Sequence, residues 1–587
     1  MHVVATAGHV DHGKSTLVRA LTGMEPDRWE EERRRGLTLD LGFAWTRLPG
    51  GADLAFVDVP GHERLVGNML AGVGPVPAVM FVVAADQGWQ RQSEEHLAVL
   101  DALDVRHGLL AVTRRDLTDA ATAAAVRDDA RKRIAATSLG EVPAVTVSGA
   151  TGEGLDELRA ALADLTGALP SPDTGADVRL WIDRVFTVQG RGTVVTGTLR
   201  AGTVSVGDEL ALADGTPVAV RGLQTLKRTR TRVGAVARVA VNLRGAPETL
   251  RRGDVLLTPG RWLTTDLIDV RLRGDASCDL PRRLTLHAGS AAVPVAVRPL
   301  GDDTARLALS RPLALRVGDI ALLRDPGAHR VPAGITVLDV RPPPFTRRGA
   351  AAARARELAA LPGVPDGACE LRRRGLIRRG DLLAMGLAPP SAPVAGDWLA
   401  DPDHWADLRR RLAEAVEEHA ARHPTDPGLP AEAARRVLGL PDRALVEALA
   451  GDDLQRRDGR LYGATTRPRL PPDVQRAVDA VRRDLAAAPF RAPEAGRLAE
   501  LGLTPKLLAA AAAAGALRKI CDGIVLLPDC ETRAAAILAR LPQPFTPGQA
   551  RQALGTTRRV AVPLLEHLDR RGYTVRVDGT HRRCPPR

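Results

Sequence analysis

The sequence predicts a multidomain protein with an α/β P-loop domain, two β-barrel domains and C-terminal tandem winged-helix (α+β) domains. Three observations predict this order. A glycine-rich loop between a strand and a helix opens the chain, short alternating strands with glycine turns follow residue 171, and helix–turn–helix plus hairpin repeats fill the last third. The length of 587 residues fits about three to five domains.

The composition is that of a globular protein with excess positive charge. The formal net charge is +12 and the isoelectric point about 10.3, which indicates a polyanionic partner such as nucleic acid, or else a simple bias toward Ala and Arg. Five cysteines lack any C-x-x-C pair, so neither a zinc site nor a disulfide framework is expected, and a reducing cytoplasm fits. No membrane span is expected, and the chain begins directly in a strand, which leaves no room for a signal peptide.

The opening strand runs into G-x-x-x-x-G-K-S, the pattern of a phosphate-binding loop, and a helix begins near its end. The two glycines let consecutive N–H groups point inward as an anion nest at a helix N-terminus. Lys14 is expected to reach the β- and γ-phosphates, and the Ser15 hydroxyl to bind Mg²⁺. A loop that serves only as a turn is the alternative, which the strand–loop–helix context disfavours. The nucleotide-binding residues predicted here are Gly8, His9, Val10, Asp11, His12, Gly13, Lys14, Ser15 and Thr16.

Strand-like runs alternate with helical stretches over residues 1–170, as in a mostly parallel sheet with helices on both faces. Asp58 ends the second run in Asp-Val-Pro-Gly-His, where its carboxylate is placed to hold Mg²⁺. Gly61 would let its N–H approach the γ-phosphate. Thr38, in the polar stretch between the two motifs, would complete the Mg²⁺ shell when a γ-phosphate is present.

The segments GHVDHGKS, RGLT and DVPGH resemble the signatures of translational GTPases of the elongation factor Tu type. The resemblance implies a P-loop GTPase domain that binds GTP and GDP with Mg²⁺. It also implies that His62 is catalytic and positions the attacking water, with Val10 and Leu37 as an apolar gate beside it. An isolated histidine is more often structural, but this one stands within the motif.

Recognition of the base is predicted at the ends of two later strands. Asp116, in Thr113-Arg114-Arg115-Asp116, is placed to accept hydrogen bonds from guanine, and Arg114 stands where the family has Lys. A planar guanidinium can still stack on a base. Ser148 and Gly149 occupy the place of the family's last guanine loop. Guanine specificity is the prediction.

Two β-barrels are predicted, over residues 177–260 and 261–342. The run LWIDRVFTVQGRGTVVTGTL resembles the second domain of elongation factor Tu-like proteins, which carries the aminoacyl end of tRNA, and residues 266–340 resemble the third. Arg184 stands where elongation factor Tu has a carboxylate beside its amino-acid pocket, and Arg238 is expected to line the same region. Two cations suit an ionised selenol better than a neutral hydroxyl. A surface Arg in an Arg-rich protein is the alternative.

Residues 345–587 follow a triple proline and are predicted to be tandem winged helices. Three stretches, 431–462, 493–527 and 546–580, each have two helices and a strand pair turning at Asp-Gly. A fourth, more divergent copy is expected over 345–415.

The last copy is the most basic, and RNA contact is predicted for its second helix and wing. A solvated surface is the alternative. The predicted RNA-binding residues are Arg558, Arg559, Arg571, Arg576, Arg582 and Arg583.

Taken together, the domain order resembles the selenocysteine-specific elongation factor (SelB) family. The resemblance implies a cytoplasmic, monomeric GTPase that delivers selenocysteyl-tRNA to the ribosome at UGA codons, binds an mRNA hairpin through its winged helices, and releases the tRNA on GTP hydrolysis. Two alternatives stay open. A general tRNA-delivery or initiation GTPase explains residues 1–340 alone, and a nucleotide-sensing DNA-binding regulator explains the tail alone.

Overall fold

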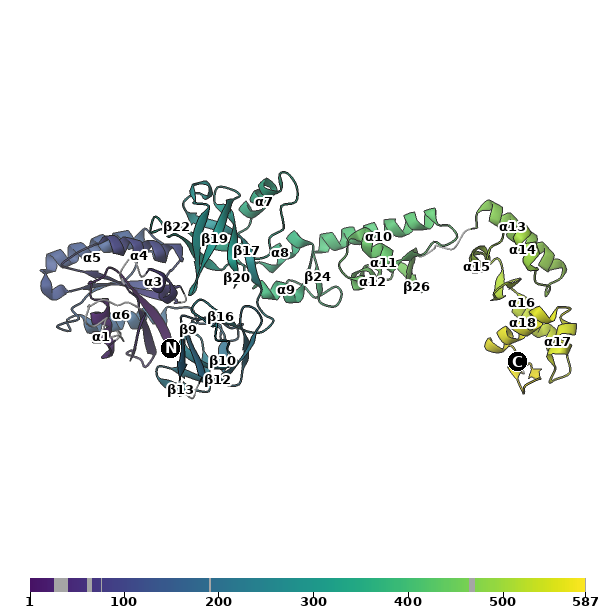
Figure 1. Ribbon diagram of the computed structural model, residues 1–587, viewed down its shortest axis with the longest axis horizontal. Helices are drawn as coiled ribbons and strands as arrows, with labels where there is room; N and C mark the ends of the chain where they lie inside the picture. Colours follow the sequence, from purple (N-terminus) through teal and green to yellow (C-terminus); the bar gives the residue numbers. More distant parts are fainter. Residues whose placement is uncertain (26–40, 61–65, 75, 189–191, 464–469, 586–587) are drawn as a thin grey trace. The chain divides into compact units, whose positions relative to one another are not determined.

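The computed structural model describes residues 1–25, 41–60, 66–74, 76–188, 192–463 and 470–585 (Figure 1). The chain divides into two units, one formed by Met1–Glu370 with Arg378–Pro390 and the other by Leu371–Ile377 with Ser391–Arg587. No helix in these described ranges is long and apolar enough to cross a membrane.

The first domain is built on a six-stranded sheet in the order β2-β3-β1-β4-β5-β6, in which only β2 runs antiparallel. Its strands are β1 (His2–Ala7), β2 (Gly42–Arg47), β3 (Asp53–Asp58), β4 (Ala78–Ala84), β5 (Gly108–Thr113) and β6 (Ala144–Thr146). Every residue of β4 is buried, as expected for a central strand with helices on both faces.

Helices cover both faces of this sheet (Figure 1). One face packs against α1 (Lys14–Thr22) and α6 (Leu155–Gly167). The other face packs against α3 (Val66–Val73), α4 (Arg91–Ala102) and α5 (Ala120–Ala135). The predicted α/β layer arrangement is therefore confirmed.

The second domain is an antiparallel sheet in the order β7-β16-β11-β12-β15-β9-β8, with β13 added beside β12 and a separate β10–β14 pair. Residues along β15 alternate between buried and partly exposed, so that one face fills the domain core. The strands are β7 (Arg179–Trp181), β8 (Arg184–Val188), β9 (Gly192–Leu199), β10 (Thr203–Ser205), β11 (Glu209–Ala211), β12 (Pro217–Thr225), β13 (Arg228–Arg230), β14 (Arg232–Gly234), β15 (Ala237–Arg244) and β16 (Val255–Leu257).

The third domain is a closed antiparallel barrel in the order β17-β20-β19-β18-β21-β22. Closure leaves no unpaired sheet edge. Its strands are β17 (Thr264–Gly274), β18 (Arg283–Ala288), β19 (Ala291–Pro299), β20 (Thr304–Ala314), β21 (Ile320–Asp325) and β22 (Arg330–Asp339).

Helix α7 (Ala350–Ala359) is held on this barrel by a buried ion-pair cluster. Arg354 Nε lies 2.7 Å from Asp269 Oδ2, and Arg354 Nη2 lies 2.5 Å from Asp339 Oδ2. Arg306 also pairs with Asp269 at 2.7 Å. All four side chains are buried. The sequence predicts that the tail begins at residue 345, but these contacts keep the chain with the barrel beyond that point.

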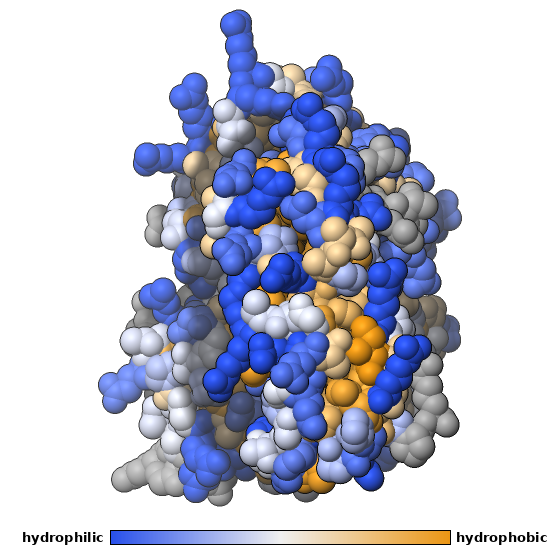
Figure 2. Space-filling view, turned by 90° about the vertical axis from the view of Figure 1, so that its right-hand side faces the viewer, coloured by the Kyte–Doolittle hydropathy of each residue, from blue (hydrophilic) through white to orange (hydrophobic). Residues whose placement is uncertain are grey.

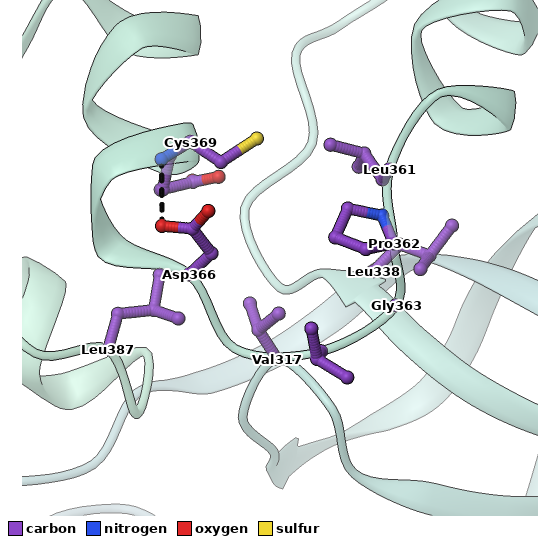
Figure 3. A pocket seen from close by; sticks show the side chains of 10 residues that line it. Val317, Leu338, Leu361, Pro362, Gly363, Asp366, Cys369 and Leu387 are labelled. Atoms are coloured by element: carbon purple, nitrogen blue, oxygen red, sulfur yellow. Dashed lines mark hydrogen bonds between the residues drawn. The ribbon is translucent and has the colours of Figure 1, made fainter.

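The segment after α7 closes against the same barrel over a small cavity (Figure 3). Its walls are mostly apolar: Val317, Leu338, Leu361, Pro362, Val364 and Leu387. Asp366 caps α8 (Gly367–Arg374) by accepting a hydrogen bond from the Cys369 N–H at 3.1 Å. The cavity is a packing gap at a domain junction, because it offers few polar groups to a ligand.

The predicted fourth repeat over 345–415 is incomplete. A short strand, β23 (Leu376–Arg378), separates α8 from α9 (Arg379–Ala384) and pairs with β24 (Trp398–Ala400). The described residues hold no helix between α9 and β24, so the second helix of a helix–turn–helix is missing there.

The three stronger repeats form the predicted helix–turn–helix and hairpin, which confirms the winged-helix prediction. In the first hairpin, Asp458 and Gly459 both have positive φ, as an Asp-Gly hairpin turn requires. The helices are α10 (Pro402–Arg422), α11 (Ala431–Leu438), α12 (Arg443–Ala450), α13 (Pro472–Ala487), α14 (Ala495–Glu500), α15 (Pro505–Ala513), α16 (Cys530–Leu538), α17 (Pro547–Ala553) and α18 (Arg558–Arg570). The strands are β25 (Leu429–Pro430), β26 (Leu454–Arg457), β27 (Arg460–Gly463), β28 (Arg518–Cys521), β29 (Ile524–Leu526), β30 (Val575–Arg576) and β31 (Arg582–Arg583).

Candidate functional site

The phosphate-binding loop lies between β1 and α1, at the carboxyl edge of the sheet. Gly8 has a φ of 129°, and a Cβ there would sit 2.1 Å from the Val82 carbonyl oxygen, so only glycine fits. Gly13 caps α1 with a φ of 77°. Lys14 Nζ donates to the carbonyl oxygens of Gly8 at 3.0 Å and His9 at 2.6 Å, which holds the curled backbone together.

Ser15 and Asp58 lie side by side next to this loop. The Ser15 hydroxyl donates to Asp58 Oδ2 at 2.7 Å, and the Thr6 hydroxyl donates to Asp58 Oδ1 at the same distance. Burial raises the pKa of the fully buried Asp58 carboxyl, while these two hydroxyls oppose the shift. One carboxylate and one hydroxyl oxygen suit Mg²⁺, which keeps several waters and takes further oxygens from phosphate. The described residues contain no group of three or more His, Cys, Asp or Glu side chains that could hold a metal ion.

Two side chains of α4 brace the loop, and sequence reasoning missed both. His96 Nδ1 accepts a hydrogen bond from the Gly8 N–H, and Gln92 Oε1 accepts one from the Val10 N–H, each at 3.0 Å. Burial lowers the pKa of His96 to about 3, so its imidazole is neutral and able to accept. Gln92 and His96 are four residues apart and so lie on one face of α4. This spacing was the only sign in the sequence that both side chains could contact the same loop.

The pKa of Lys14 gives a testable pH dependence. Burial lowers the pKa of Lys14 to about 8 in the nucleotide-free protein, and bound phosphates would raise it by stabilising the ammonium. The nucleotide complex then binds more protons than the free protein, so the association constant for GTP should fall about fourfold between about pH 7 and about pH 8.5. Titration calorimetry in buffers of different ionisation enthalpy measures this proton uptake. Proton release, or none exchanged, at the upper pH would contradict the expectation.

Two of the predicted base-recognition residues, Thr113 and Arg114, contact the loop directly. Thr113 donates through its hydroxyl to the His12 carbonyl at 2.6 Å. The Arg114 guanidinium donates to the Asp11 carbonyl and pairs with Asp86 at 3.2 Å, so it ties the loop to the end of β4. Asp116 follows on a short 3₁₀ turn, Arg115–Leu117.

The last predicted base loop lies after β6. The Ser148 hydroxyl accepts hydrogen bonds from the N–H groups of Ala150 and Thr151, at 3.3 and 3.1 Å. Gly149 lies against Thr16, so a Cβ at that position would be 3.3 Å from the Thr16 methyl. Gly149 therefore lies against the start of α1, the helix that follows the phosphate-binding loop. Thr38, Gly61 and His62, together with Leu37, lie outside the described residues.

Arg184 and Arg238 meet at one aromatic ring of the first domain. The guanidinium carbons lie 5.0 and 4.0 Å from the centre of the Phe43 ring, within cation–π range. Arg184 also donates to the Leu41 carbonyl. Phe43 lies on β2, so the strand that follows the predicted switch segment is in direct contact with the predicted amino-acid pocket.

A third charge changes the electrostatics of this pocket. Arg238 forms a two-point ion pair with the buried Asp183, with its Nη2 at 2.7 Å from Oδ1, and also bonds the Thr196 hydroxyl at 3.1 Å. The sequence predicts two cations here, Arg184 and Arg238. Asp183 neutralises Arg238, so the three side chains Arg184, Arg238 and Asp183 together have a net charge of one positive.

The predicted RNA-binding arginines divide into two groups. Arg582 is a correction to the prediction: it is 7% exposed and its Nε donates to Asp569 at 2.8 Å, so it stabilises the domain from within. Arg559 donates to the carbonyls of Ala492 and Pro493, at 3.2 and 3.0 Å, and so joins the last winged helix to the preceding one.

The remaining arginines face solvent. Arg558 and Arg583 are exposed and have no ion pair to any residue in the described ranges. Arg571 is 58% exposed, 3.9 Å from Glu531. Arg576 is exposed and bonds two carbonyls of its own wing turn. Figure 2 shows that hydrophilic side chains cover most of the end of the molecule that it faces, with a smaller hydrophobic area.

The phosphate loop, the Ser15–Asp58 pair and the base loops, on a parallel sheet followed by two barrels, define a GTP-binding protein of the elongation factor Tu class. Family models agree: residues 1–168 match the elongation factor Tu GTP-binding domain, 265–344 the β-barrel domain of selenocysteine-specific elongation factors, and 536–583 a winged helix of elongation factor SelB. The chain is 31% identical to the selenocysteine-specific elongation factor of Escherichia coli K12 over 629 aligned positions, which cover 99% of this chain and 98% of the relative. It therefore belongs to the selenocysteine-specific elongation factors (SelB), GTPases that deliver selenocysteyl-tRNA.

Solved structures show the same fold. A crystal structure of a bacterial selenocysteine-specific elongation factor aligns over the full length of both chains with a TM-score of 0.78 at 24% identity. The SelB of Methanococcus maripaludis in complex with a GTP analogue aligns over 58% of this chain and 79% of that one, with a TM-score of 0.52 at 23% identity.

Proposed function

We propose that this chain holds GTP with Mg²⁺ on the Gly8–Ser15 loop and carries selenocysteyl-tRNA in a pocket at Arg184 and Arg238. In this proposal, Ser15, Asp58 and Thr38 hold Mg²⁺, which neutralises charge on the phosphates during hydrolysis. The observation that supports the metal role is the 2.7 Å contact of the Ser15 hydroxyl with the buried Asp58 carboxylate. Asp116 reads guanine, and Arg114 holds the loop from the side.

Hydrolysis would depend on the last two residues of the Asp-Val-Pro-Gly-His motif. Gly61 brings its N–H toward the γ-phosphate, and His62 orients the attacking water. When the γ-phosphate leaves, Thr38 lets go and the segment before β2 changes its arrangement. Because Leu41 and Phe43 contact the two arginines, this change would reach the amino-acid pocket directly and release the tRNA.

The pocket would select selenocysteine by charge. A selenol is ionised at neutral pH and serine is not, so a guanidinium in a partly desolvated pocket stabilises only the former by ion pairing. The observation that carries this proposal is the pair of guanidiniums gathered on Phe43, one of them neutralised by Asp183. Arg184 would meet the selenolate, and Asp183 would keep Arg238 in place.

Replacing Arg184 with alanine tests this selection. The variant should lose about tenfold in affinity for selenocysteyl-tRNA relative to seryl-tRNA, which corresponds to ~1.4 kcal/mol. Both affinities are measured in the GTP form, by protection of the aminoacyl bond from hydrolysis. Arg244→Ala is the matched control, because Arg244 is an exposed arginine of the same domain with no ion pair in the described ranges. Equal losses for the two tRNAs would remove Arg184 from the selection.

The last winged helix would bind the mRNA hairpin through Arg558, Arg571, Arg576 and Arg583. An RNA hairpin is held through its backbone shape and exposed loop bases, which suits a helix and wing with exposed guanidiniums. The full chain would act as a cytoplasmic monomer.

Sequencing of RNA that copurifies with the full chain separates this function from its alternatives. Enrichment of selenocysteine tRNA and of messages with a hairpin after UGA is expected. Bulk elongator or initiator tRNA would instead indicate a general delivery or initiation factor, and bound duplex DNA would indicate a regulator.

A further inference from the structure

A cluster of cations on the turn after β12, on β13 and at the start of β14 has no role in the site described above. We call it the basic hairpin: Lys227, Arg228, Arg230 and Arg232. All four residues are exposed, and none forms an ion pair with any residue of the described ranges. Four neighbouring unpaired cations repel one another, so an anionic partner would stabilise them.

The hairpin is held in a definite position by its turn. Leu226 and Lys227 connect β12 to β13. Their φ values are 50° and 59°, a left-handed backbone conformation that residues other than glycine rarely adopt. Leu226 packs against the hydrophobic core of the first domain, and Lys227 Nζ lies 5.4 Å from the centre of the Trp45 ring. These contacts compensate the strained turn. The turn that bears these cations is thus held in place by contacts with the first domain.

The basic hairpin borders the predicted amino-acid pocket. Strand β12 pairs with β15, and the Thr225 hydroxyl donates to the Arg238 carbonyl at 2.8 Å. Thr225 is in turn the cross-strand partner of Arg228. Thr225 therefore links Arg228 of the basic hairpin to Arg238 of the predicted pocket.

We propose that the basic hairpin binds backbone phosphates of the acceptor end of the tRNA. A tRNA whose aminoacyl end lies at Arg184 and Arg238 must bring the phosphates of its adjacent nucleotides past the pocket rim, where the hairpin stands. Unpaired cations on a rigid hairpin fix the path of such a backbone without reading its sequence. The inference rests on the proposed pocket and extends it to a second contact with the same cargo.

The test compares tRNA binding by the full chain and by Arg228→Gln/Arg230→Gln at several salt concentrations. The double variant should bind selenocysteyl-tRNA about tenfold more weakly at low salt. Its plot of log affinity against log salt should be shallower by about 1.5, since two phosphate contacts are lost. Arg131→Gln/Lys132→Gln on α5 is the matched control, because both of these cations are exposed and unpaired in the described ranges, and it should bind like the wild type.

Each remaining outcome decides the proposal. Arg228→Lys/Arg230→Lys should restore the salt slope if charge is what matters, and a failure to restore it would point to a folding role and overturn the proposal. Unchanged tRNA binding would also overturn it. If such a variant showed slower ribosome-stimulated GTP hydrolysis, the hairpin would be assigned to ribosomal RNA instead. Wild-type protein that binds no selenocysteyl-tRNA would refute the proposed pocket itself, before any variant is compared.

Discussion

Replacing Arg354 with alanine should lower the free energy of unfolding of the first unit by about 3–5 kcal/mol. Arg354 pairs with Asp269 and Asp339, and all three side chains are at most 3% exposed. Removal of the guanidinium leaves the buried carboxylates of Asp269 and Asp339 without the arginine that they share. This costs far more free energy of unfolding than the loss of an exposed ion pair. Urea denaturation, followed with limited proteolysis, measures both the loss of stability and the release of α7.

Arg410→Ala is the matched control, since Arg410 also contacts two carboxylates but its side chain is 60% exposed. Its removal should cost less than ~1 kcal/mol. A similarly small loss for Arg354 would mean that water reaches the cluster and that α7 is only loosely attached. Faster cleavage near Gly349, on the chain before α7, is expected in the Arg354 variant alone.

This cluster explains why the start of the tail could not be predicted from the sequence. The triple proline at 342–344 correctly indicates a break in regular structure. What holds α7 to the barrel, however, is a contact between Arg354 and residues 15 and 85 positions earlier. Composition and spacing indicate where a chain turns. They carry no information on which distant carboxylates will be buried together.

The repeats were easier to predict because their signals are local. Asp-Gly between two strand-like runs indicates a hairpin by itself, and Asp458-Gly459 forms that turn. The predicted fourth, more divergent copy over 345–415 shows the limit of such local signals. Its helices were inferred by analogy with the other repeats, and the missing second helix leaves no mark in residue spacing.

The nucleotide site was predictable to the extent that its residues are contiguous. The loop residues and Asp58 came from motifs, whereas Gln92, His96 and Asp183 were missed, since each acts on a partner brought near only by folding. Arg582 illustrates the opposite error. Counting arginines on a short wing cannot show which one turns inward, and its pairing with Asp569 decides that.

Replacing His62 with alanine should leave GTP affinity near its wild-type value but reduce ribosome-stimulated hydrolysis by a factor on the order of 10³. The loop, Lys14 and the Ser15–Asp58 pair bind the phosphates without His62. Loss of the group that orients water therefore affects the transition state and spares the ground state. Nucleotide binding is followed by fluorescent GDP displacement, and hydrolysis by single-turnover phosphate release on programmed ribosomes.

His107→Ala is the control for this experiment. His107 precedes β5 at the amino edge of the sheet, opposite the edge that carries the loop, so its removal should leave both measurements unchanged. Asp116→Asn should show the reverse pattern to His62→Ala, with weaker GTP binding, because guanine recognition contributes to the ground state. Wild-type stimulated hydrolysis in the His62 variant would show that water is oriented by another group. The role implied by the Asp-Val-Pro-Gly-His motif would then be withdrawn for this chain.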